Sequence, residues 1–329
     1  MADRIENIKG VGKLLDAGAT ALKEKHIDFV GRAETSNAVR MARDYIDSLS
    51  IEVRMLDADP ATTEAEFFGE TFSTPVMPAP LSGLGGVWPD GLVEIAKAAV
   101  EANTVMWIGI GGEKEMADVA ATGAKFVKII KPYANHDVII EKIRLAEKYN
   151  ALAVGIDTVF GYGAKKGDTL IMPKPLAPVS TAELVGYVDA TRLPFVVKGV
   201  LSVRDAKKAK DAGAAAIVVS SHSGSVLDYA VPPLQVLPEI FETVGGGMSI
   251  FIDGGFARGT DAFKALALGA DGVLFGRNLI RALAVGGSET ALAYLTGVTE
   301  ELKRVMNLTD SPSPQEIDSS TIRGQGRNA

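Results

Sequence analysis

The chain has 329 residues, of which 47% are hydrophobic and 23% are charged, and it contains 35 glycines and no cysteine. This is the composition of a globular protein, and it excludes the disordered and fibrous classes. The net charge of −7 argues against nucleic acid or an anionic membrane surface as the main partner. Without cysteine there are no disulfides, no thiolate metal ligands and no cysteine nucleophile, and we predict no metal site.

The first 74 residues predict a helical and hairpin extension that precedes the main domain. The opening stretch MADRIENIKGVGKLLDAGA lacks the basic and then apolar layout of a secretory signal, so we expect a cytoplasmic protein. No apolar run approaches the roughly 18 residues of a membrane span, which argues against a membrane protein. TSNAVRMARDYIDSL is typical of a helix, and TEAEFFGETFS of a small hairpin that turns at Gly69.

From residue 75 the chain alternates short apolar runs with segments of helical periodicity. Apolar residues recur at helical spacing in WPDGLVEIAKAAVEAN and DVIIEKIRLAEKYN. The apolar runs are continuous and rich in Val and Ile, as expected of parallel strands buried on both faces. Eight such runs lie at 75–83, 104–111, 125–131, 151–157, 194–200, 215–221, 248–255 and 271–277.

Three junctions repeat a pattern that ends a helix before the next strand. Gly123, Gly213 and Gly269 each follow a helical segment and precede an alanine and an apolar run. Glycine adopts the left-handed backbone conformation that terminates helices. Eight strands that alternate with helices predict an α/β fold, specifically a TIM (β/α)8 barrel.

No linker divides the chain, so we expect a single domain over 1–329. Within it we assign 1–74 to the segment before the barrel, 75–297 to the barrel, and 298–329 to a C-terminal helix and tail. The tail LTDSPSPQEIDSSTIRGQGRNA is polar and rich in Pro and Ser, which predicts irregular structure.

Polar residues lie at the ends of three consecutive predicted strands. Asp157 ends the fourth strand, Lys198 lies near the end of the fifth, and His222 follows the sixth. In a (β/α)8 barrel the C-terminal ends of the strands form the mouth of the active site. Each residue alone is more often a cap or a surface residue. Together they predict an acid, a cation and a base on one rim.

Glycine and arginine follow the seventh and eighth strands, in DGGFARG and in the pair Gly276 and Arg277. Glycines let backbone N–H groups approach an anion, and the N-terminus of the following helix favours negative charge. The loops after these two strands form the usual phosphate site of such barrels. We therefore predict that Arg258 and Arg277 bind the phosphate of a cofactor or substrate.

Two stretches in the second half of the chain carry a resemblance to a known family. SSHSGSVLDYAVPPLQVLPEI and FIDGGFARGTDAFKALALGADGVLFGRNL resemble the FMN-dependent α-hydroxy-acid oxidases and dehydrogenases, the group of glycolate oxidase and lactate oxidase. The similarity extends over most of the chain and is densest from Pro194 to Leu279. The resemblance implies a barrel that binds FMN at its mouth, and an oxidoreductase that acts on a small molecule.

The resemblance also implies a role for each matching residue. His222 matches the catalytic base, Asp157 the carboxylate that orients it, and Lys198 the lysine beside the N1/O2 edge of the flavin. A fixed cation at that edge stabilises the negative charge of reduced flavin. The other implied cofactor contacts are Pro80, Leu81 and Ser82 beside the flavin ring, Lys128 on the third strand, Asp253 at the ribityl chain, and Gly254, Gly255, Arg258, Gly276 and Arg277 at the phosphate.

The site for the substrate carboxylate departs from the family pattern. Ser225 stands where the family has an arginine that binds this carboxylate, and Ile130 stands where it has a tyrosine. A second carboxylate-binding arginine has no counterpart in VFGYGAKKGD, and only 40 residues separate Asp157 from Lys198, which predicts a shortened lid loop. We therefore predict that His222 is still a base, but on a substrate other than a simple small 2-hydroxy acid.

Three alternatives stay open. In the first, the protein is a genuine 2-hydroxy-acid oxidase in which Lys128, Lys165 or Lys166 replaces the missing arginines. In the second, Lys198 is a Schiff-base nucleophile in a redox-free barrel that binds a phosphorylated substrate. The third is a flavin-binding protein without turnover. The resemblance also implies a homo-oligomer, for which a tetramer is the expected form.

Overall fold

The structure is a computed structural model that describes residues 10–28, 32–172 and 174–324. A single sheet of eight parallel strands forms its centre. The strands follow one another in the order β4 (Val76–Pro78), β13 (Gly272–Phe275), β12 (Ser249–Ile252), β11 (Ala216–Val219), β10 (Phe195–Val200), β7 (Ala153–Asp157), β6 (Phe126–Ile130) and β5 (Met106–Ile108). A parallel bridge between Leu81 and Ile108 joins the two ends of this sheet. The predicted (β/α)8 barrel is confirmed, and each strand lies within one of the eight predicted runs.

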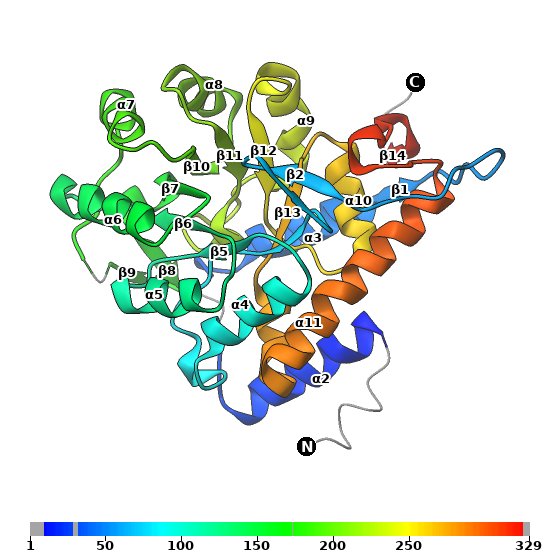
Figure 1. The fold of residues 1–329 in the computed structure, drawn as a ribbon, viewed down its shortest axis with the longest axis horizontal. Helices are drawn as coiled ribbons and strands as arrows, with labels where there is room; N and C mark the ends of the chain where they lie inside the picture. The colour runs from blue at the N-terminus through cyan, green and yellow to red at the C-terminus, as the bar shows by residue number, and fades with distance from the viewer. Residues whose placement is uncertain (1–9, 29–31, 173, 325–329) are drawn as a thin grey trace.

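Each strand of the sheet is followed by a helix. Figure 1 shows these helices around the outside of the sheet. Gly123, Gly213 and Gly269 have φ angles of 83°, 85° and 106°, so the predicted left-handed helix stops are present. The helices are α4 (Gly91–Glu101), α5 (Glu113–Ala121), α6 (His136–Lys148), α7 (Thr181–Asp189), α8 (Val203–Asp211), α9 (Pro233–Val244), α10 (Gly259–Ala267) and α11 (Arg277–Leu308). The boundary predicted after residue 297 falls inside α11, which bends at Gly286 and Gly287. Within the described part of the chain, no helix is both long enough and apolar enough to cross a membrane.

The core has two layers, because successive side chains of a strand point to opposite faces of the sheet. Val127 and Ile129 of β6 belong to the cluster inside the barrel, together with Trp107 and Phe251. Phe126 and Ile130 belong to the second cluster, between the sheet and the helices. Every residue of β6 is buried, so the two layers are indistinguishable by burial alone.

The N-terminal segment closes the barrel and supports its outside. α2 (Val11–Glu24) lies alongside α11, and the helix predicted near residue 40 is α3 (Asn37–Ser48). The predicted hairpin is present as β2 (Ala65–Phe67) and β3 (Glu70–Phe72), paired antiparallel. Phe67 reaches the inner core, where its ring lies 5.5 Å from that of Phe251. The hairpin therefore contributes apolar side chains to the interior of the barrel.

The C-terminal tail is more regular than its composition predicts. Residues Ile322–Gly324 form β14, which pairs antiparallel with β1 (Leu49–Ile51). Short 3-10 turns at Pro314–Glu316 and Ser319–Thr321 precede it. The prediction of an irregular tail is wrong for Ile322–Gly324, because β1 offers backbone partners that a composition argument does not include. A further short hairpin, β8 (Ala164–Lys166) and β9 (Thr169–Ile171), lies in the loop between β7 and α7.

Candidate active site

The structure brings the three predicted strand-end residues to one rim of the barrel. Asp157 and Lys198 are register partners on β7 and β10, and His222 follows β11. His222 Nδ1 lies 2.9 Å from Asp157 Oδ2. Lys198 Nζ donates to Ser220 Oγ at 2.7 Å and pairs with Asp253 Oδ2 at 2.9 Å. An imidazole–carboxylate pair and an ammonium–carboxylate pair therefore lie side by side.

The backbone at His222 is strained in a way that fixes its side chain. His222 and Ser223 have φ angles of 46° and 57°, in the left-handed region that disfavours residues other than glycine. Such positions cost on the order of 1–3 kcal/mol each and persist where the surroundings hold them. Ser220 Oγ accepts from the His222 N–H at 3.1 Å, and Ser225 Oγ donates to the His222 carbonyl at 2.8 Å. These two serines hold the turn on both sides of the histidine.

Burial and neighbouring charges shift the pKa values of Asp157, His222 and Lys198 in different directions. Burial acts to raise the pKa of Asp157, but Lys131 and Lys198 outweigh it and hold that pKa well below its usual range. Burial and Lys131 lower the pKa of His222 to about 4, against the opposing effect of Asp157. Burial also acts on Lys198, but Asp253 and Asp157 raise its pKa above the usual value. At neutral pH the cluster holds a neutral imidazole, a carboxylate and an ammonium group.

Sequence reasoning missed Lys131, which contacts the same carboxylate. Lys131 Nζ lies 2.9 Å from Asp157 Oδ2 and 3.1 Å from the centre of the Phe160 ring. The Phe160 ring in turn meets the His222 ring edge-on, with centroids 4.3 Å apart. The available signal was spacing, because residue 131 continues the series 127 and 129 that faces the barrel interior.

The same alternation corrects two expectations on β6. Lys128 was expected at the flavin and Ile130 at the substrate, but both side chains point away from the barrel interior. Lys128 Nζ donates to the carbonyls of Gly109 and Gly111, and Ile130 packs in the layer between sheet and helices. Ile129 faces the catalytic cavity instead. Both expectations are wrong because the assignment is displaced by one residue along β6. A shift of one residue exchanges the side chains that face the barrel interior with those that face the helices.

The rim residues line a catalytic cavity of about 340 Å3. Its walls include the predicted residues Pro80, Leu81, Ser82, Asp157, Lys198, His222, Ser225, Asp253, Gly276 and Arg277, together with Gly109, Ile110, Ile129, Lys131, Phe160, Ala164, Lys165 and Ile171. Ser82 Oγ donates to the Leu81 carbonyl and accepts from the Gly111 N–H, which fixes this segment after β4. The cavity thus joins the titratable cluster to an apolar wall.

A second cavity of about 510 Å3 adjoins the first and is rich in cations. Both cavities are lined by Ser223, Asp253, Gly276 and Arg277, so they form one continuous groove. The further lining residues with charge or a glycine backbone are Lys23, Asp28, Arg32, Arg43, Gly254, Gly255 and Arg281. Gly254 and Gly255 have φ angles of 121° and 90°, which a residue with a side chain adopts only under strain.

This second cavity has the chemistry of a phosphate site. Burial, Arg32 and Arg281 lower the pKa of Arg277 to about 10. None of these three guanidinium groups forms a salt bridge with a carboxylate in the described residues, and Arg32 Nε is buried without a hydrogen-bond partner. The N-terminus of α11 begins at Arg277 and adds its positive dipole end. Guanidinium groups without a carboxylate partner, beside a helix N-terminus, fit a bound phosphate.

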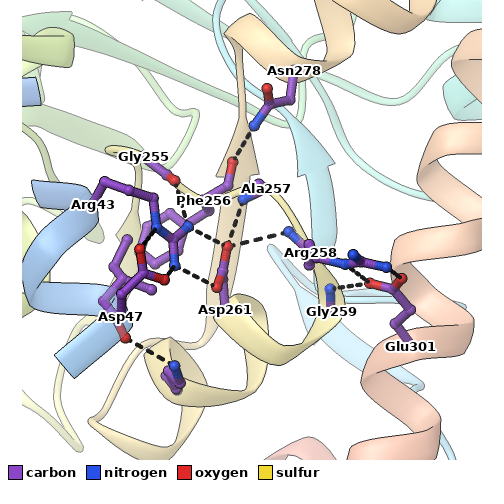
Figure 2. Close-up of polar contacts among 12 residues, drawn as sticks. Arg43, Asp47, Gly255, Phe256, Ala257, Arg258, Gly259, Asp261, Asn278 and Glu301 are labelled. Atoms are coloured by element: carbon purple, nitrogen blue, oxygen red, sulfur yellow. Dashed lines mark hydrogen bonds and ion pairs between the residues drawn. The ribbon is translucent and has the colours of Figure 1, made fainter. Parts of the chain in front are cut away.

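Arg258 does not belong to this cluster, contrary to expectation. Figure 2 shows its side chain directed to α11, where its Nη2 lies 2.5 Å from Glu301 Oε1. Glu301 also accepts from the Gly259 N–H at 3.0 Å, so the pair anchors the start of α10 to α11. Arg32 and Arg281 take the place expected for Arg258. Of these, Arg281 was detectable, because it lies four residues after Arg277 and so on the same face of α11.

Fold and site together define a class of protein: a (β/α)8 barrel that holds a phosphorylated cofactor beside a histidine–aspartate pair. A model of the FMN-dependent dehydrogenase family matches residues 19–183 and 174–324, which is most of the chain. The chain belongs to this family. It is an FMN-dependent oxidoreductase, and the resemblance stated from the sequence is confirmed.

Relatives and solved structures agree with this assignment. The chain is 30% identical to glycolate oxidase 1 of Oryza sativa subsp. japonica over 89% of each chain. It is 28% identical to a peroxisomal (S)-2-hydroxyacid oxidase of Arabidopsis thaliana over 97% of each chain. A structure of mandelate oxidase with (S)-2-phenylpropionate superposes with a TM-score of 0.88 at 29% identity, over 96% of this chain and 98% of the other. These comparisons do not favour the redox-free Schiff-base alternative.

Proposed function

We propose that His222 is the catalytic base of this oxidoreductase, and that its substrate is not a small 2-hydroxy acid held by two arginines. The carrying observation is the His222–Asp157 pair, 2.9 Å apart, in a groove that continues into the arginine cluster. The proton acceptor and the predicted phosphate site therefore lie at two ends of one groove.

The hydrogen bond to Asp157 gives His222 the tautomer that a base needs. With Nδ1–H donating to Asp157, the Nε2 lone pair is left to take a proton from the substrate. The pKa of about 4 keeps the ring neutral before reaction, and the carboxylate stabilises the imidazolium that forms. Asp157 is held charged by Lys131 and Lys198, so it does not compete for the proton.

The residues present fit FMN. Bound FMN supplies the two-electron acceptor for the oxidation. Its phosphate would be held by Gly254, Gly255, Gly276, Arg277, Arg32 and Arg281, and its ring by Pro80, Leu81, Ser82 and Lys198, with Asp253 between them. The raised pKa of Lys198 suits a fixed cation beside the ring, whereas a Schiff-base nucleophile must be a neutral amine.

The wall near His222 offers little to a small carboxylate. Ser225 is buried and its hydroxyl is committed to the His222 carbonyl. Lys131 is paired with Asp157, and Lys165 with Glu34 at 2.5 Å. Of the three lysines considered as replacements for arginine, Lys128 faces away from the groove and Lys166 does not line it. None of these three lysines is therefore an unpaired cation in the groove that could replace a carboxylate-binding arginine.

Glycolate and lactate are accordingly expected to reduce the bound flavin slowly or not at all. A bidentate guanidinium–carboxylate contact is lost at Ser225, and a serine hydroxyl does not reproduce it. Anaerobic stopped-flow measurement of flavin absorbance with each acid is the test. Ser225→Arg restores the guanidinium but removes the Ser225 Oγ bond to the His222 carbonyl, so it should recover only part of the rate with both acids. Rapid bleaching of the unmodified protein by either acid would refute this part of the proposal.

Arg277→Ala is expected to weaken FMN retention. A charge-assisted hydrogen bond contributes about 1.5–3 kcal/mol, so the dissociation constant should rise roughly 10- to 150-fold. The measurement is FMN fluorescence on titration into apoprotein. Arg258→Ala is the matched control and should leave this constant unchanged, because its guanidinium pairs with Glu301 outside the groove. Equal losses in the two variants would show that the phosphate site is misplaced.

Cellular location and assembly stay predictions. The cytoplasmic location rests on the sequence alone, and the Arabidopsis thaliana relative is described as peroxisomal. A homo-oligomer, with a tetramer as the expected form, rests on the family resemblance. Light scattering on the purified protein measures the second directly.

A further inference from the structure

A third cavity, of about 410 Å3, opens from the catalytic cavity. The two share Ile110, Lys131, Phe160, Ala164 and Ile171. Phe160 therefore separates the His222 ring from this space. The residues that line the third cavity but not the catalytic one are Gly112, Tyr133, Lys142, Lys174 and Leu176. None of them belongs to the groove assigned above to FMN, so the space is available to the part of a substrate that does not react.

The far end of this cavity is built by the chain that follows β6 and the chain that follows β9. Tyr133 forms an antiparallel bridge with Leu176. The Ala134 N–H donates to the Pro175 carbonyl, and the Ala177 N–H to the Pro132 carbonyl, both at 3.0 Å. These bonds tie the segment that follows β9 to the segment that follows β6. Lys174 and Lys142 of α6 thereby line the same end of the cavity, each beside the ring of Tyr133.

Apart from Lys131, which is paired with Asp157, the near part of the cavity is apolar and uncovered. Ile110 and Ile171 are 42% and 43% exposed, although they flank the catalytic cluster. Leu176 and the Phe160 ring complete this wall. Large apolar side chains that line a cavity and stay exposed are typical of a ligand-binding wall. An aliphatic or aromatic segment would remove them from water.

The far part of the cavity is lined by two lysines and by no acidic side chain of the described residues. The Nζ atoms of Lys142 and Lys174 lie 5.9 Å and 5.8 Å from the centre of the Tyr133 ring. Neither forms a salt bridge with a carboxylate of the described residues. Two ammonium groups that share one aromatic ring without a counterion favour an anionic partner between them.

We propose that this cavity is a substrate subsite for an apolar segment that ends in an anionic group, a carboxylate or a phosphate, held by Lys142 and Lys174. The inference rests on the proposed function, because it places the oxidised carbon at His222. The substrate class is then an amphipathic hydroxy compound whose anion is remote from the reacting carbon. This explains how binding proceeds without an arginine at position 225: the anchoring charge has moved to the other end of the molecule.

The test is binding of octanoate and octanamide to the FMN-loaded protein by calorimetry. The two probes share an apolar chain and differ in charge. We expect octanoate to bind at least about tenfold more tightly, the effect of a charge-assisted contact. In the double variant Lys142→Gln and Lys174→Gln, the difference should fall to within about twofold. Lys148→Gln is the matched control on α6, because Lys148 pairs with Glu113 outside the cavity. Octyl phosphate as a third probe distinguishes phosphate from carboxylate preference.

Equal binding of octanoate and octanamide to the unmodified protein would overturn the proposal, as would a difference that persists in the double variant. Lys174→Gln alone is the second variant if the double variant does not fold, since Lys174 is exposed. The same titration on His222→Asn should keep the tenfold preference. If His222→Asn keeps both the preference and the turnover of a hydroxy compound, the base assignment fails and the subsite stands. If His222→Asn loses turnover but the unmodified protein shows no preference, the subsite fails and the base assignment stands.

Discussion

His222→Ala is expected to remove turnover while FMN remains bound. The loss should be about 10²- to 10⁴-fold, the usual contribution of a positioned base, and larger where water has no access. Cofactor retention should not change, because Arg32, Arg281 and the Gly254–Gly255 turn line the second cavity and not the catalytic one. The rate is measured as anaerobic bleaching of the bound flavin by the hydroxy compound that reduces the unmodified enzyme fastest in a screen.

Two comparisons make this expectation specific. His136→Ala removes a histidine on the outer side of α6, where it contacts Tyr187, and should leave the rate unchanged. In the unmodified enzyme the rate should stay level as pH falls through 6.5 and decline only towards pH 4, because burial and Lys131 lower the pKa of His222 to about 4. A base must be neutral, so the decline lies on the acid side. A variant that keeps its rate within tenfold would rule out His222 as the base.

The sequence predicted the barrel well because parallel strands leave a strong signal. Continuous apolar runs bounded by glycine locate all eight strands, and the polar residues that end three of them mark the rim. The glycine stops and the hairpin at Gly69 follow from local backbone chemistry in the same way. Each of these features depends on residues that are neighbours in the chain.

The errors arise where the signal is not local. Phe126–Ile130 is buried throughout, so no alternation of polar and apolar residues shows which side chains face the groove. Lys128 and Ile130 were therefore assigned to the wrong face, and Lys131 was missed. Arg258 follows a glycine-rich turn as a phosphate ligand would, but its direction depends on Glu301, a residue 43 positions away. Contacts across the fold decided these positions.

Asp157→Asn is expected to destabilise the fold by about 3–5 kcal/mol, the cost of leaving a buried charge without its partner. The amide keeps the size of the carboxylate and removes only its charge. Lys131, now unpaired, and Lys198 would then remain as buried cations with less compensation. Urea unfolding monitored by fluorescence measures the loss. Asp189→Asn, at the exposed end of α7, is the matched control and should change stability by less than about 0.5 kcal/mol.

The pH dependence of this loss has a definite sign. The pKa of Asp157 lies well below its value of 3.8 in an unfolded chain, so its charge stabilises the native state fully above pH 3.8 and progressively less as pH falls below it. The difference in unfolding free energy between Asp157→Asn and the unmodified protein should therefore be largest near neutral pH and shrink in acid.

A double variant separates the charge on Lys131 from the other effects of the substitution. Lys131→Met in the Asp157→Asn background removes the unpaired cation and should recover part of the lost stability, with a coupling energy of about 0.5–3 kcal/mol. His222 gives an independent readout, because Asp157 raises its pKa against burial while Lys131 lowers it. Asp157→Asn should thus move the acid limb of the rate below pH 4, and the added Lys131→Met should move it back. An additive cycle with an unmoved acid limb would mean that the three residues do not act as one electrostatic unit.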